Sequence, residues 1–181
     1  MKIQTKNDLE KTREEGLKSL YPGTIKISVG MATCGLSTGA GKVYEAIEKE
    51  IGKAKVPIRL ERTGCIGFCQ REPVVDILEP GKPRVFYQGV TPERCGELVE
   101  KWLENRVVED LLFCKMEKED RILEGSVKDY TIQSIPAGID GTPNYHQVPF
   151  YGKQLKIALR NCGFINPDHI EEYIARGSVP R

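Results

Sequence analysis

The fold is decided by one stretch, residues 24–62, which reads TIKISVGMATCGLSTGAGKVYEAIEKEIGKAKVPIRLER. Its first seven residues are β-branched and alternating, as is typical of a strand, and residues 56–62 predict a second strand. Between them, residues 31–41 are rich in glycine, serine and threonine and predict a loop, after which a helix should follow. The apolar side of that helix would hold Val43, Ala46, Ile47 and Ile51. Strand, helix and strand in this order predict a right-handed crossover between parallel strands.

A hairpin and a second helix follow this unit. Residues 73–78 and 83–87 are apolar runs that flank a turn signal, EPGK, at residues 79–82. Thr91 can cap a helix whose first residue is proline. The apolar stripe of that helix would hold Cys95, Leu98, Val99, Trp102 and Leu103. The order of elements predicts an α/β domain of the thioredoxin-like type over residues 22–105, with a four-stranded mixed sheet and flanking helices.

The segments on either side of this domain differ from it in character. Residues 1–21 predict a leader helix, and residues 106–145, with their clustered glycine and proline, predict an extended connector with a strand or two. Residues 146–181 predict two short helices, which are too small to form a core and should pack on something outside this chain. The first would carry Leu155, Ala158, Leu159 and Cys162, and the second, between Asn166 and Gly177, would carry Ile170, Tyr173 and Ile174.

Composition excludes several classes of protein. The 181 residues include 27 Lys and Arg against 26 Asp and Glu, a net charge of +1, which does not favour nucleic-acid binding. No apolar run approaches the roughly 20 residues of a membrane-spanning helix. The charged N-terminus lacks the apolar centre of a secretory signal, so a cytoplasmic location is expected. In that reducing compartment the six cysteines should be metal ligands, a reactive thiol or buried packing residues.

Three cysteines stand in predicted loops. Cys65 and Cys69 lie in TGCIGFCQREP, where the neighbouring glycines let a loop fold tightly and point N–H groups at sulfur. Cys34 lies in the loop after the first strand. Because the loops that follow two parallel strands leave the sheet at the same end, we expect Cys34, Cys65 and Cys69 to converge. Three thiols are fewer than the four ligands that zinc or an iron–sulfur cluster requires.

The remaining cysteines are expected to be packing residues, and the two histidines are not expected to bind a metal. Cys95 lies on a helix stripe, Cys114 within LLFC, and Cys162 on a predicted helix face. His146 and His169 are both in the C-terminal segments and are not expected to be ligands. The sequence contains no C-x-x-C dithiol of the kind used in thiol exchange, and no phosphate-binding or dinucleotide fingerprint. Nothing in it supports a catalytic triad or a catalytic carboxylate pair.

Two stretches resemble a known family. MATCGLSTGAGKVYEAIEKEI and RTGCIGFCQREPVVDI look like the thioredoxin-like [2Fe-2S] ferredoxin domain, in the version fused at the N-terminus of the NADH-binding flavoprotein subunits of NAD-linked hydrogenases and complex I relatives. VPFYGKQLKIALRNCGFINPDHIEEYIARG resembles the lead-in to the flavin domain of those subunits. Residues 146–181 would then be a helical lead-in, and the chain ends before the glycine-rich flavin site.

The resemblance implies an electron-transfer module of a multisubunit NAD-linked oxidoreductase, with other subunits of that complex as partners and without FMN or NAD on this chain. It implies a [2Fe-2S] cluster with Cys34, Cys65 and Cys69 as ligands. The family usually has two cysteines near the first strand, about five residues apart, whereas this chain has Cys34 and, near the other position, Ser28. A serine oxygen, a ligand from outside or no cluster at all remain open. The alternatives are a cluster-free docking domain for partner subunits and a structural zinc site.

Overall fold

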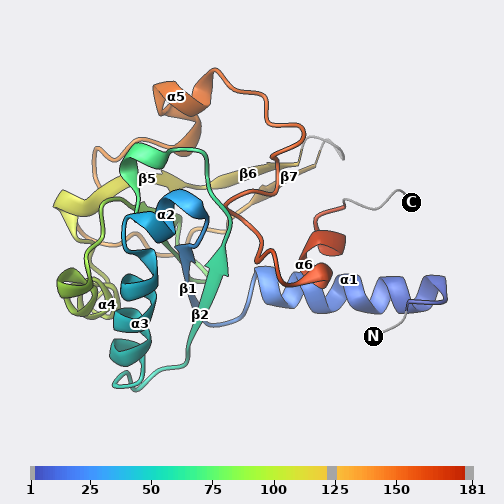
Figure 1. Cartoon of the computed structure of the whole chain (residues 1–181), viewed down its shortest axis with the longest axis horizontal. Coiled ribbons are helices and arrows are strands. Elements are labelled where there is room, and N and C mark those ends of the chain that lie inside the picture. The colour runs from blue at the N-terminus through green and yellow to red at the C-terminus, as the bar shows by residue number, and fades with distance from the viewer. Residues whose placement is uncertain (1–2, 122–125, 178–181) are drawn as a thin grey trace.

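The computed structural model describes residues 3–121 and 126–177, and it is built around one mixed sheet (Figure 1). The strands are β1 (Ile25–Gly30), β2 (Ile58–Thr63), β3 (Val75–Leu78), β4 (Arg84–Tyr87) and β5 (Leu112–Met116), in the order β2-β1-β3-β4-β5. β1 and β2 are parallel, and the other neighbours are antiparallel. The predicted α/β class and thioredoxin-like order of elements are confirmed, with five strands in the sheet instead of the predicted four.

The fifth strand comes from the predicted connector. β5 pairs with β4 and extends the sheet by one strand, because the chain turns back after the helix that ends at Leu103. Beyond it, β6 (Lys118–Arg121) and β7 (Ser126–Asp129) form a separate two-stranded antiparallel sheet. Ile139 then returns to the main core, where it is fully buried.

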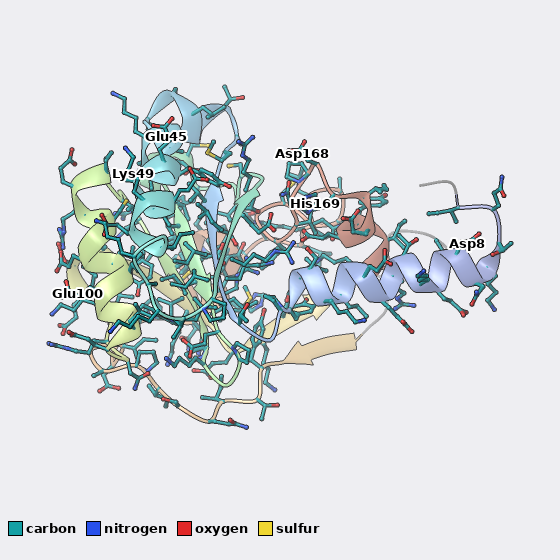
Figure 2. The ribbon with its side chains drawn as sticks, turned by 90° about the horizontal axis from the view of Figure 1, so that it is seen from below. Asp8, Glu45, Lys49, Glu100, Asp168 and His169 are labelled. Atoms are coloured by element: carbon teal, nitrogen blue, oxygen red, sulfur yellow. The ribbon has the colours of Figure 1, made fainter. Side chains whose placement is uncertain are left out.

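Two helices cover one face of the sheet. α3 (Ala40–Ile51) and α4 (Cys95–Leu103) pack against each other, and a short 3₁₀ turn, η2 (Pro92–Arg94), leads into α4. The predicted apolar stripes face the core, where Ala46 and Ile51 of α3 are partly buried and the other members are buried. The exception is Leu103, which ends α4 and is 43% exposed. Figure 2 shows the opposite faces, where Glu45, Lys49 and Glu100 point away from the core.

The predicted loop over residues 31–41 contains a short helix, α2 (Thr33–Ser37). Its last carbonyl groups are satisfied locally, since the hydroxyls of Ser37 and Thr38 donate to the Cys34 carbonyl at 2.8 and 2.9 Å. Gly39 follows with a positive φ of 104° and turns the chain into α3. The serine and threonine residues that favoured a loop therefore serve here to close a single helical turn.

The leader helix has its partner within the chain. α1 (Lys6–Leu20) begins at a capping box between Thr5 and Asp8, and it packs along α6 (Ile170–Ala175), as Figure 1 shows. Ser19 at its end donates to the buried carboxylate of Glu172 at 2.5 Å. The expectation that the C-terminal helices pack on something outside the chain is therefore wrong for α6.

The helix predicted to carry Leu155, Ala158, Leu159 and Cys162 is absent. The chain forms a 3₁₀ turn, η4 (Tyr145–Gln147), and one helical turn, α5 (Pro149–Gly152), and then runs in turns. A short amphipathic helix is stable only when its apolar face is buried. In this segment Leu155, Ile157 and Leu159 are instead 73%, 57% and 61% exposed. The contacts that fix it are those of Lys156, described below.

The second face of the sheet is covered by the C-terminal half of the chain. Phe86 and Cys114 on the strands pack against aromatic residues from the last forty positions. Tyr145 and Tyr151 are stacked with ring centroids 4.1 Å apart, and Phe164 lies against Tyr145. Among the described residues there is no helix of the length and hydropathy needed to cross a membrane.

The packing of α1 on α6 can be tested at Gly16. A Cβ there would lie 2.0 Å from the Glu171 carbonyl oxygen, so we expect Gly16→Ala to lower the free energy of unfolding by about 1–3 kcal/mol. Gly41, inside α3, has no atom within 4 Å of its Cβ position, so Gly41→Ala should leave stability unchanged or raise it by up to about 1 kcal/mol. Urea unfolding of both variants measures the difference, and equal effects would contradict the close approach of the two helices.

Candidate metal centre

Three cysteines gather at the carboxyl edge of the parallel strands. Cys34 lies in α2, directly after β1, and Cys65 lies in the loop after β2. Cys69 begins the 3₁₀ turn η1 (Cys69–Arg71). The two strands end side by side, since Gly30 is in register with Thr63 and the Met31 N–H donates to the Thr63 carbonyl at 2.9 Å. The structure therefore places the three cysteines at one edge of the sheet, and their role as ligands stays a prediction.

The thiol of Cys69 is a neighbour of the other two. It interacts with the side chains of both Cys34 and Cys65, and the Cys34 thiol is the main reason why the pKa of Cys69 is raised. Burial, partly offset by the Gly67 N–H, raises the pKa of Cys65. That N–H donates to the Cys65 sulfur at 3.1 Å, and Gly67 can place it there because its φ is +91°. Metal binding to such a group requires deprotonation and so releases protons.

The donor set suits a thiolate-bound metal but is incomplete. Thiolate sulfur is the ligand that iron–sulfur clusters and many zinc sites use. Within residues 3–121 and 126–177, however, no three His, Cys, Asp or Glu side chains are close enough to hold a metal ion. Ser28 is 3% exposed inside β1, in register with Asp76 of β3, and therefore lies in the sheet rather than in the cysteine loops.

Two of the other cysteines are core residues. Cys95 and Cys114 are completely buried, and burial raises the pKa of each thiol to about 12. The Cys95 thiol donates to the Thr91 carbonyl at 3.3 Å. Cys114 packs in the second core beneath the aromatic residues. These positions agree with the packing roles predicted from the sequence.

Cys162 and Lys156 are site neighbours that sequence reasoning missed. Cys162 is half-buried and lines the same cavity as Cys65. The ammonium group of Lys156 donates to the Ile66 carbonyl at 2.7 Å and to the Tyr145 hydroxyl at 2.9 Å. It therefore holds the peptide between Cys65 and Cys69 from a distant part of the chain. No local sequence signal marks such a contact.

The two histidines lie in the C-terminal segments, outside the cysteine loops. Figure 2 shows His169 beside Asp168, in the turn before α6. His169 lies 3.9 Å from the Glu172 carboxylate. His146 belongs to η4, where its ring meets that of Tyr145 edge-on.

The chain is similar to a subunit of a known hydrogenase. The chain is 33% identical over 104 residues to the NADP-reducing hydrogenase subunit HndB of Solidesulfovibrio fructosivorans, and the match covers 56% of this chain and 82% of the relative. No protein-family model matches the chain.

Solved structures of a thioredoxin-like [2Fe-2S] ferredoxin from Aquifex aeolicus are also similar to part of the chain. One is 26% identical, with a TM-score of 0.46, and covers 51% of this chain and 92% of its own. A second, of the wild-type ferredoxin, is 26% identical with a TM-score of 0.44 and covers 49% and 95%.

Proposed function

Because the chain belongs to the family of the hydrogenase subunit HndB, we propose that it is an electron-transfer module that carries a [2Fe-2S] cluster. The observation that carries this proposal is that the Cys69 thiol interacts with the side chains of both Cys34 and Cys65. When bound, a [2Fe-2S] cluster takes up and releases an electron. The three cysteines would ligate iron, and the Gly67 N–H would stabilise negative charge on the Cys65 sulfur.

The proposed setting is a multisubunit, NAD-linked redox complex in the cytoplasm. HndB is itself described as a subunit of a hydrogenase. Leu155, Ile157 and Leu159 are exposed close to the cysteine loop, as a surface that meets another subunit would be. The near-zero net charge gives no support to a nucleic-acid partner.

Anaerobic reconstitution of the full chain tests the proposal. We expect a red-brown protein with visible absorption, about two iron atoms and two sulfides per chain, and a paramagnetic reduced state. Zinc without sulfide would support the structural zinc site instead. A colourless, metal-free protein would overturn the proposal and favour the cluster-free docking domain, which the exposed apolar residues of the 153–160 segment also suit.

The same preparation tests the expected absence of nucleotide cofactors. The sequence contains no dinucleotide fingerprint, so we propose that this chain binds neither FMN nor NADH by itself. Adding NADH to the oxidised reconstituted protein should leave its visible absorption unchanged. Bleaching by NADH would contradict this part of the proposal.

A further inference from the structure

The segment that carries Cys162 lies directly against the cysteine loop. A Cβ on Gly163 would come within 2.2 Å of the Ile66 side chain, and Gly163 has a φ of +83°. Similarly, a Cβ added to Gly64 would lie 3.8 Å from the Gly163 nitrogen. The backbones on either side of Cys65 and next to Cys162 are therefore close neighbours.

This contact is held in place by groups on both sides. Arg84 donates to the Gly163 carbonyl at 3.3 Å, and the ring of Phe164 is buried beneath the guanidinium of the same arginine. From the other side, Lys156 donates to the Ile66 carbonyl. Cys162 is thus placed by an anchored segment rather than by a free one.

One cavity is shared by the two cysteines. Cys65 and Cys162 both line it, together with Lys156 and the exposed Leu155 and Leu159. The Lys156 ammonium group is fixed there, because it donates to the Ile66 carbonyl at 2.7 Å and to the Tyr145 hydroxyl at 2.9 Å. Two cysteines therefore border the same space beside the cysteine loop.

Two of the remaining cysteines are core residues. Cys95 and Cys114 are completely buried in the two hydrophobic clusters, one on each face of the sheet. Cys34, Cys65 and Cys69 supply three of about four thiolates that a [2Fe-2S] cluster uses. We propose, resting on the function proposed above, that Cys162 supplies the fourth thiolate of the cluster and so ties the C-terminal segment to the thioredoxin-like domain.

The test compares reconstituted Cys162→Ala and Cys162→Ser with the parent chain and with Lys153→Ala, an exposed position on the same segment outside the cavity lining. Iron, sulfide, visible absorption and electron paramagnetic resonance are measured, with urea unfolding of each metal-free chain to check folding. Iodoacetamide labelling of the loaded parent, read by mass spectrometry, reports which cysteines are protected.

We expect Cys162→Ala to retain less than about half of the parent's iron, because a four-thiolate site has lost one ligand. Cys162→Ser should keep part of the iron with a shifted spectrum, and Lys153→Ala should match the parent.

The outcomes separate this inference from the proposed function. If the parent binds its cluster and Cys162→Ala keeps the same iron and spectrum, the fourth ligand is another group and the inference is wrong, while the proposed function stands. Labelling of Cys162 in the loaded parent at the rate found in the metal-free chain would overturn it in the same way. A parent without iron would overturn both.

Discussion

Replacing Cys65 by alanine should remove the iron and the colour of the reconstituted protein. Its sulfur neighbours Cys69, accepts the Gly67 N–H and borders the cavity shared with Cys162, so it contacts more of the candidate site than an isolated thiol would. We expect iron per chain to fall roughly tenfold or more, since a cluster that loses one of three gathered thiolates keeps too few ligands. Cys34→Ala and Cys69→Ala should have the same effect, as measured by iron content and visible absorption.

Cys95→Ala provides the matched control. This thiol is completely buried, and it contacts the carbonyl groups of Val43 in α3 and of Thr91. The variant should keep its colour and lose on the order of 1 kcal/mol of stability in urea unfolding, because a small buried group has been removed. Loss of iron from Cys95→Ala together with its retention by Cys34→Ala would show that the ligand assignment is wrong.

The main domain could be predicted because its signals are local. The alternation in residues 24–30 and the stripe of Val43 and Ile47 specify a strand and a helix by periodicity alone. The crossover rule then places the loops after β1 and β2 at one edge. This is why the convergence of Cys34 with the Cys65 loop followed from the sequence.

The C-terminal segment could not be predicted in the same way. Leu155, Leu159 and Cys162 have helical spacing, yet the bond from Lys156 to the Ile66 carbonyl and the contact of Gly163 with Ile66 decide the backbone. Both contacts join residues far apart in the chain, and propensity is a weak guide where tertiary contacts compete with it. The missed proximity of Cys162 to Cys65 is a direct consequence of that wrong helix.

Arg84→Met should destabilise the whole fold more than any surface substitution. Arg84 of β4 and Asp76 of β3 form a salt bridge with an Nε–Oδ1 distance of 2.7 Å, and both side chains are 3% exposed. Removing the guanidinium leaves the carboxylate buried without its cationic partner and removes a donor to the Gly163 carbonyl. Such a loss costs about 3–5 kcal/mol, because a lone buried charge is far less favourable than a hydrated one.

Urea unfolding of three further variants separates the burial of this pair from the mere presence of an ion pair. Lys53→Met breaks the exposed pair between Lys53 and Glu50 and should cost less than about 1 kcal/mol. Arg84→Met combined with Asp76→Leu removes both buried charges, so it should recover a large part of the stability lost in Arg84→Met. Asp76→Leu alone should be as damaging as Arg84→Met, since it leaves the guanidinium uncompensated between the sheet and Phe164. If Arg84→Met lowers the free energy of unfolding no more than Lys53→Met does, the pair between Arg84 and Asp76 is not shielded from water. The claim that Arg84 holds the Gly163 carbonyl in place would then be wrong as well.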